Sequence, residues 1–241
     1  MTAGTARPDE HLHWFAAERA AFRQVLETGD LQAPVPGCPG WDLAALTAHL
    51  GGVHRWARLA VLTGSDSPEQ PAPEGREALV HWFEEGAAAL EHVLRDTEPE
   101  KPCWTIAPPA TAAFWIRRQA QETAIHRWDA QSSQGQPEPL DPALAADGVA
   151  EVVDMLYPRQ VRLGRQAPLT HSLRIEVTNG TTYTLAERSD LSPESVDATI
   201  TGPADVLLLL LWKRTTLEDP RVRLSGSAAV AREILGAHIT P

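Results

Sequence analysis

The chain has 241 residues, 43% of them apolar, which is enough for one large hydrophobic core or two smaller ones. Acidic residues number 32 against 21 basic ones, so the formal net charge is -11, and no run of Lys or Arg is present. Because phosphate backbones and anionic lipids bind to clustered positive charge, we expect no non-specific binding to nucleic acid or to a membrane surface.

The cysteines and the apolar runs favour a cytoplasmic protein. Cys38 and Cys103 lie in separate segments without metal-ligand spacing, which indicates neither a disulfide framework nor a thiolate zinc site. The first 14 residues contain no apolar signal core, and the longest apolar run, residues 206–212, is too short to span a bilayer. We therefore expect a soluble cytoplasmic protein that is a monomer or a homodimer.

Four amphipathic segments of helical length make up the first half of the chain. They cover residues 10–28, 42–63, 76–97 and 111–131. The breaks between them, which contain "APVPGCPGW", "SDSPEQPAPEG" and "EPEKPCWTIAPP", are rich in proline and glycine, which end one helix and redirect the chain. This pattern is typical of a four-helix bundle.

The second half of the chain mixes helices and strands. Asp141 and Pro142 form an N-cap and first turn for a fifth helix that extends to about Tyr157. Alternating apolar residues on both sides of Asn179-Gly180 predict a β-hairpin. A strand, a buried helix, a strand and a closing helix are then predicted in "VDATITG", "PADVLLLLLWKR", "RVRLSG" and "SAAVAREIL". We expect an α+β chain, with a helical bundle and its connecting helix in residues 1–158 and a small α/β domain in residues 159–241.

The second predicted helix directs a histidine towards the core. At about 100° per residue, one arc of this helix is apolar, and Arg55 and Arg58 lie on the other side. The arc contains Leu46, Leu50, Val53, Trp56, Ala57 and Ala60. His49 falls inside the arc and His54 near its edge. A buried imidazole needs a partner, which is either a metal ion or a backbone carbonyl.

The third predicted helix has a similar spacing without the same orientation. His81, Glu85 and His92 are spaced as ligands on a helix, but the apolar residues of this helix lie opposite them. We interpret this set as a solvated face.

The fourth predicted helix supplies a carboxylate and a second imidazole. Trp115, Glu122, His126 and Asp129 share one stripe. Taken alone, Glu122 and His126 could be an exposed ion pair. Together with His49 on another helix of the bundle, they make two imidazoles and a carboxylate, a set that leaves one position of a zinc ion open. Glu18 on the first helix is then either an outer partner of the metal or a charged group at a packed edge.

Four segments resemble one known family, in order and over nearly the whole chain. They are "VPGCPGWDLAALTAHLGGVHRWA", "QETAIHRWDAQ", "DPALAADGVAEVVDMLYP" and "DATITGPADVLLLLLWKR", which resemble the mycothiol-dependent maleylpyruvate isomerase family. The resemblance implies a DinB-like four-helix bundle that carries a divalent metal, usually zinc, and a C-terminal domain similar to sterol carrier folds. It also implies the metal ligands, namely His49 of "TAHLGG" and Glu122 and His126 of "ETAIH".

The resemblance further implies an activity. In the isomerase for which the family is named, the thiolate of mycothiol adds to a conjugated double bond, the new single bond rotates, and elimination releases the trans isomer. We therefore expect an enzyme that isomerises or S-conjugates an electrophilic small molecule of the maleylpyruvate type, with this substrate and the thiol cofactor as its partners. An arginine of the second domain is expected to assist by holding a substrate carboxylate in a cleft between the domains. Arg214 is our first candidate for this catalytic role, and Arg221 and Arg223 are rivals.

Other interpretations stay open at this point. A non-catalytic protein that binds a small molecule or senses a metal would complete the metal shell with protein, through His54 or Asp129. The ligand types favour zinc but also suit iron, cobalt or nickel. Cys38 is not expected to be a nucleophile, because no histidine base is identifiable for it.

Overall fold

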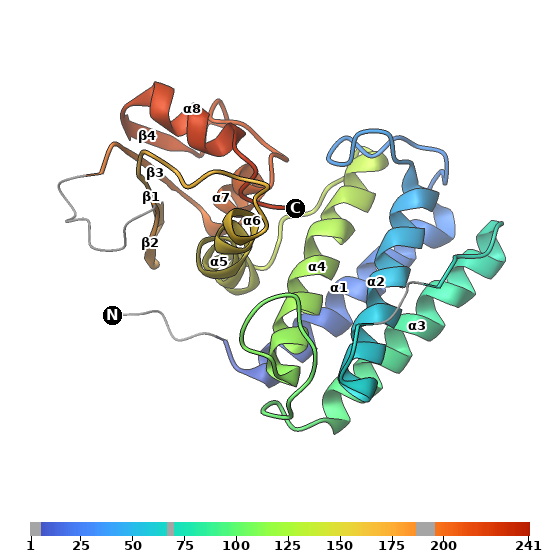
Figure 1. Ribbon diagram of the computed structural model, residues 1–241. Helices are drawn as coiled ribbons and strands as arrows, with labels where there is room; N and C mark the ends of the chain where they lie inside the picture. Colours follow the sequence, from blue (N-terminus) through green and yellow to red (C-terminus); the bar gives the residue numbers. More distant parts are fainter. Residues whose placement is uncertain (1–5, 67–69, 187–195) are drawn as a thin grey trace. The chain divides into compact units, whose positions relative to one another are not determined.

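The computed structural model describes residues 6–66, 70–186 and 196–241. They form two compact units, Ala6–Pro139 and Leu140–Pro241, which are described separately below (Figure 1). The first unit is helical and the second combines helices with a four-stranded sheet, so the predicted α+β class is confirmed. No helix among these residues has the length and hydropathy of a membrane span.

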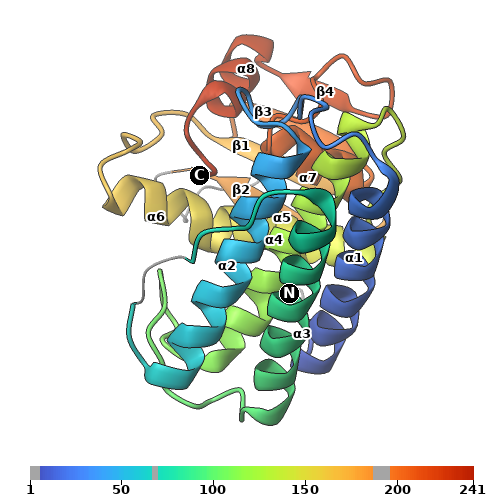
Figure 2. The ribbon, with the colours of Figure 1, turned by 90° about the vertical axis from the view of Figure 1, so that its right-hand side faces the viewer.

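The first unit is a bundle of four long helices. They are α1 (Pro8–Thr28), α2 (Leu43–Thr63), α3 (Arg76–Asp96) and α4 (Ala112–Ser133), which lie side by side (Figure 2). Each helix occupies a predicted segment, with ends that differ by at most two residues. The proline- and glycine-rich breaks therefore end the helices where the sequence indicates.

The core of the bundle fixes the start of α2, which carries His49. Phe22, Leu26, Leu46 and Phe83 belong to one cluster of buried apolar residues contributed by α1, α2 and α3. At the N-terminus of α2, Oδ1 of Asp42 accepts a hydrogen bond of 2.8 Å from the backbone N–H of Ala45. This cap satisfies a free donor of the first turn, so α2 begins at a defined residue.

The burial of Arg55 differs from the predicted orientation of α2. The helical projection assigned it to the polar side, but its side chain is buried. Its guanidinium lies 3.9 Å from the centre of the Trp82 ring and donates to the backbone carbonyls of Trp82 and Gly51. The prediction was wrong because it assumed one packed face, whereas α2 packs against both α3 and α4. Gly86 on α3 leaves the space that the guanidinium fills.

The second unit begins with a long, interrupted helix. It consists of α5 (Pro142–Glu151), the π-helical turn η1 (Val152–Leu156) and α6 (Tyr157–Arg162). Asp141 caps α5 as expected, because its carboxylate accepts from the backbone N–H groups of Ala143 and Leu144. Helix α5 packs against α7 (Ala204–Leu211) within this unit, although the sequence-based domain boundary lies after residue 158.

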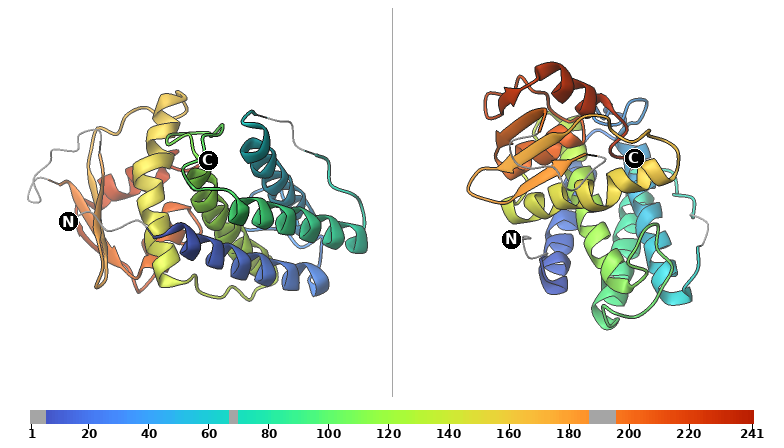
Figure 3. Two further views of the ribbon diagram at one scale, coloured as in Figure 1. Left: turned by 90° about the horizontal axis from the view of Figure 1, so that it is seen from below. Right: turned by 60° about the vertical axis from the view of Figure 1, so that its left-hand side comes forward.

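The sheet of the second unit has the strand order β2-β1-β3-β4. The strands are β1 (Leu173–Val177), β2 (Thr182–Leu185), β3 (Ala198–Gly202) and β4 (Arg223–Gly226). Strands β1 and β2 form the predicted hairpin around Asn179-Gly180, and β1 and β3 are parallel. Helices α7 and α8 (Ala228–Gly236) pack against the sheet (Figure 3).

Candidate metal centre

Helices α2 and α4 bring together His49, Glu122 and His126, the three predicted ligands. Nε2 of His49 and Nε2 of His126 each lie 3.3 Å from the same atom, Oε1 of Glu122. The three donor atoms lie within 4.8 Å of one another. Zinc–ligand bonds of about 2.0–2.1 Å in a tetrahedron place two ligand atoms roughly 3.3 Å apart. The two separations equal those expected of neighbouring ligands on one ion, and they are also hydrogen-bond distances.

Arg118 determines which oxygen of Glu122 faces the imidazoles. Its buried guanidinium donates from Nη2 to Oε2 of Glu122 at 2.7 Å, so Oε1 is the oxygen that the histidines meet. Burial would raise the pKa of Glu122, but Arg118 and the hydrogen bonds with His126 and His49 hold this pKa well below its ordinary value. Glu122 is therefore an anion at neutral pH.

The second ring nitrogen of His126 faces another carboxylate. Nδ1 lies 3.1 Å from Oδ2 of Asp129, and Sγ of Cys38 lies 3.6 Å from that oxygen. Burial opposes protonation of His126, but the hydrogen bonds with Asp129, Cys38 and Glu122 together raise its pKa well above the ordinary value. The His126 ring thus lies between two carboxylates, in surroundings that favour positive charge. Cys38, His126 and Asp129 form a second possible set of metal donors.

His54 and Glu18, the other two residues considered as partners of a metal site, form contacts with residues outside the set of His49, Glu122 and His126. His54 is buried, and its Nε2 lies 3.0 Å from Oγ1 of Thr123. Burial lowers the pKa of His54 to about 3, so the ring is neutral. Glu18 forms a buried ion pair with Arg127. The partner of its carboxylate is therefore Arg127 rather than any of the three predicted ligands.

The third helix behaves as the sequence predicts. His81, Glu85 and His92 are all exposed on α3. His92 forms only a surface pair with Asp96, at 3.3 Å between Nε2 and Oδ2. The predicted orientation of this set is therefore confirmed. The projection of α2 was less accurate, because His54, expected near the edge of the apolar arc, is buried, whereas His49, expected inside it, is partly exposed.

In the second unit, the three candidate arginines have different surroundings. Arg214 follows α7, where its Nη1 donates to the carbonyl of Trp212 at 2.8 Å and its guanidinium lies 5.6 Å from the centre of the Trp212 ring. Arg221 forms two hydrogen bonds with Asp219, at 2.7 and 3.0 Å. Arg223 is exposed at the start of β4. Asp219 thus binds the guanidinium of Arg221, and the partners of Arg214 include the carbonyl and the ring of Trp212.

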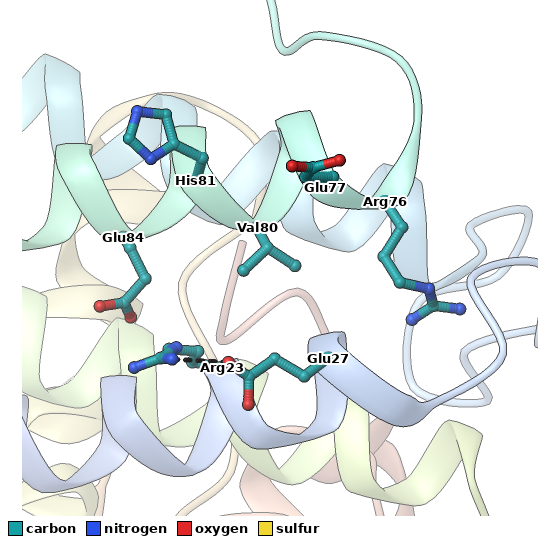
Figure 4. Close-up of a pocket in the computed structure, with 7 residues that line it drawn as sticks. All are labelled: Arg23, Glu27, Arg76, Glu77, Val80, His81 and Glu84. Atoms are coloured by element: carbon teal, nitrogen blue, oxygen red, sulfur yellow. Dashed lines mark hydrogen bonds and ion pairs between the residues drawn. The ribbon is translucent and has the colours of Figure 1, made fainter.

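A surface groove between α1 and α3 is not part of this centre (Figure 4). Its volume is about 670 Å³, and its lining residues are Arg23, Glu27, Arg76, Glu77, Val80, His81 and Glu84. Arg23 pairs with Glu27 at 2.6 Å, and Arg76 donates to the carbonyls of Leu26 and Gly29 at the C-terminal end of α1. The arginine charges are thus engaged within the protein, and none of the three predicted ligands lines the groove.

The chain thus combines two units. The first is a helical bundle that brings two histidines and a glutamate together, and the second is a small α+β unit. Comparison with family models matches residues 12–131 to the mycothiol maleylpyruvate isomerase N-terminal domain and residues 143–233 to the C-terminal domain of the same family. The chain belongs to the mycothiol-dependent maleylpyruvate isomerase family of enzymes.

Solved structures share the fold over most of the chain. A crystal structure of the mycothiol-dependent maleylpyruvate isomerase matches with a TM-score of 0.64 and 16% identity, over 91% of this chain and 93% of that chain. A mutant of that isomerase, with one histidine replaced by alanine, matches with a TM-score of 0.63 at the same identity and coverage. Comparison with curated protein sequences gives no match.

Proposed function

We propose that the protein is a zinc-dependent enzyme that uses mycothiol to isomerise or S-conjugate an electrophilic small molecule of the maleylpyruvate type. The observation that carries this proposal is the position of Glu122 Oε1, at 3.3 Å from Nε2 of both His49 and His126. The family supports the thiol and the class of substrate.

The residues present fit a zinc ion by chemistry as well as by spacing. Two imidazole nitrogens and one carboxylate oxygen are donors that zinc accepts, and three protein ligands leave one position for an outside molecule. A zinc ion bound there would lower the pKa of a coordinated thiol, so that a thiolate nucleophile persists at neutral pH.

The protein's own side chains hold the donors in place. Arg118 fixes the rotamer of Glu122 through its 2.7 Å hydrogen bond. The Trp41 ring lies 4.9 Å from the His49 ring, centre to centre, and restricts the movement of this partly exposed imidazole. Fixed donors avoid the cost of reorganisation when a ligand binds, which is how a site is prepared for catalysis.

In the second unit, we propose Arg214 as the residue that binds a carboxylate of the substrate. A guanidinium can form two parallel hydrogen bonds with a carboxylate, a geometry that lysine lacks. The rival Arg221 donates two hydrogen bonds to Asp219. Replacing Arg214 with lysine should raise KM for a carboxylate substrate more than tenfold, while zinc content stays unchanged.

The alternative of a non-catalytic metal sensor is supported less well. That alternative needs a further protein ligand, for which His54 and Asp129 were the candidates. His54 contacts Thr123, and Asp129 contacts the other nitrogen of His126. Neither belongs to the set formed by His49, Glu122 and His126, which favours a position that a thiol can take.

Zinc content tests the ligand assignment. The wild-type protein is expected to bind zinc at about one ion per chain, and Glu122→Ala and His126→Ala are expected to abolish stoichiometric binding. His81→Ala on the exposed face of α3 is the matched control and should keep its zinc. Equal zinc content in all of these proteins would contradict the proposed site.

The spectrum of the cobalt-substituted protein tests the use of the thiol. Addition of mycothiol should change the visible absorption of bound cobalt and add a thiolate-to-metal charge-transfer band. An unchanged spectrum at millimolar mycothiol would contradict the proposed function. A maleylpyruvate assay with and without mycothiol then separates isomerisation, which regenerates the thiol, from conjugation, which consumes it.

A further inference from the structure

We propose that Asp129 is a positioning residue that fixes the tautomer of His126, so that Nε2 is the nitrogen available to the metal. This inference rests on the proposed function, because it concerns how one ligand of the proposed site is prepared. It assigns roles to Asp129 and Cys38, neither of which is a member of the ligand set formed by His49, Glu122 and His126.

The contact between Asp129 and His126 carries the inference. Asp129 lies three residues after His126 on α4, its side chain is 0% exposed, and its Oδ2 lies 3.1 Å from Nδ1 of His126. An ionised carboxylate can only accept hydrogen bonds, so Nδ1 must carry the proton. In the neutral ring, the lone pair is then on Nε2. Nε2 is the atom that faces Glu122 Oε1 at 3.3 Å.

This arrangement calls for a cation on the other side of the ring. A lone pair on Nε2 and an oxygen of an anionic carboxylate repel each other at 3.3 Å, so a proton or a metal ion must lie between them. A proton on Nε2 fills this role when no metal is bound, and a metal ion held by Nε2, Glu122 and His49 would replace that proton. A carboxylate hydrogen-bonded to the far nitrogen of a metal-bound histidine also raises the basicity of the ligand and fixes the ring orientation.

Cys38 contacts the same oxygen and also lies near the His126 ring. Its Sγ lies 3.6 Å from Oδ2 of Asp129, within the reach of a thiol hydrogen bond, although the two residues are 91 positions apart. The loop before α2 is itself ordered by backbone hydrogen bonds, which include Cys38 N–H to the carbonyl of Val35 at 3.0 Å. The thiol therefore acts as a donor that keeps the Asp129 carboxylate aimed at Nδ1.

A rival arrangement uses the same atoms as ligands. Cys38, His126 and Asp129 also have donor atoms within 4.8 Å of one another, so a metal could be bound through Nδ1 instead of Nε2. The two arrangements predict opposite results for Cys38. If Cys38 is only a hydrogen-bond donor, Cys38→Ser should keep zinc affinity within about threefold of wild type. If Cys38 is a ligand, the same change should abolish binding.

Zinc affinity, measured by competition with a chromophoric chelator, is the first test. Asp129→Ala should raise the Kd for zinc by about 10–100-fold, the usual effect of losing an outer partner of a metal ligand. Asp129→Asn keeps the size of the side chain and can still accept from Nδ1–H, so its Kd should rise less. Asp96→Ala is the matched control, because Asp96 forms an exposed pair with His92 at 3.3 Å; its Kd should not change.

Nitrogen NMR of the zinc-loaded protein is the second test. If Asp129 only stabilised the fold, its replacement would not change the protonation pattern of the His126 ring. In the wild type, His126 should show a protonated Nδ1 and a metal-bound Nε2. In Asp129→Ala, the Nδ1–H proton should exchange rapidly with water. A wild-type spectrum with zinc on Nδ1 would overturn the proposal.

The outcomes separate this inference from the proposed function. If His49→Ala, Glu122→Ala and His126→Ala lose zinc while both Asp129 variants bind it with wild-type affinity, only the role of Asp129 is contradicted. If the three ligand variants also bind zinc as the wild type does, the proposed function fails as well. Loss of zinc in Cys38→Ser would place the metal in the rival set.

Discussion

Arg118 and Glu122 lie one turn apart on α4, with Nη2 of the arginine 2.7 Å from Oε2 of the glutamate, and both side chains are at most 15% exposed. Arg23 and Glu27 on α1 have the same spacing and order, but both are at least 40% exposed. The first pair orients a proposed metal ligand, whereas the second contacts water. The comparison provides a test of what burial adds to an otherwise identical pair.

Replacing Arg118 with glutamine should weaken zinc binding by about tenfold, because Glu122 loses the donor that fixes its Oε2. Arg23→Gln removes the equivalent exposed arginine and should leave the Kd for zinc unchanged. The measurement is chelator competition at neutral pH. Equal Kd values for the wild type and Arg118→Gln would show that Arg118 does not orient the ligand.

The neutral, buried His54 makes stability depend on pH. Burial lowers its pKa in the folded protein to about 3, whereas the ordinary value in an unfolded chain is about 6.5. Between these two values, the unfolded chain binds a proton that the folded protein does not. The stability contributed by the neutral ring is therefore present above pH 6.5 and is lost as the pH falls, at about 1.4 kcal/mol per pH unit.

Urea unfolding in the presence of a chelator, between pH 5 and pH 8, measures this contribution. His54→Gln cannot titrate in this range, so its free energy of unfolding should fall less steeply below pH 6.5 than that of the wild type. The difference between the two proteins isolates His54 from the other titrating groups. Parallel curves would mean that His54 is protonated in the folded state.

Gly86→Ala should destabilise the bundle by about 1–3 kcal/mol. A Cβ at this position would meet the buried guanidinium of Arg55, which packs over the Trp82 ring. The control is Glu85→Ala, which removes the exposed carboxylate 3.6 Å from the same guanidinium and should change stability little. Thermal unfolding followed by circular dichroism compares the two variants. A larger loss in Glu85→Ala would contradict the packing argument.

Glu18→Ala should lower the free energy of unfolding by about 3 kcal/mol, because it leaves the buried Arg127 without its carboxylate. Zinc content should stay at the wild-type level, because Glu18 does not contact the ligands. Glu27→Ala, which removes an exposed carboxylate from the same helix, should have a smaller effect on stability. Loss of zinc in Glu18→Ala would instead support a role next to the metal.

The sequence was sufficient for most of the helical bundle. Hydrophobic periodicity and proline- and glycine-rich breaks predicted α1 to α4, and Asn179-Gly180 predicted the hairpin of the sheet. Helical projection also separated the exposed His81 from His49, whose Nε2 lies near Glu122. These successes share a cause, since each depends on the periodicity of a single element.

Features that depend on two or more elements were not predictable in this way. The burial of Arg55 requires the missing side chain of Gly86 on a neighbouring helix, and the contact of Cys38 with Asp129 spans 91 positions. The pairing of Arg118 with Glu122 had a signal in its four-residue spacing, but that spacing also occurs in exposed pairs such as Arg23 and Glu27. Only the three-dimensional packing distinguishes the buried pair from the exposed one.

The proposed ligands come from two helices, and this division links metal binding to folding. Glu122 and His126 are one turn apart on α4 and stay close whenever that helix forms, whereas His49 is 73 positions before Glu122. An ion bound by all three would act as a cross-link that closes a loop containing the whole of α3, much as a disulfide restricts an unfolded chain. Removing the ion should therefore loosen the packing of α2 on α4 before any other part of the bundle opens, and hydrogen exchange in α2 would report it.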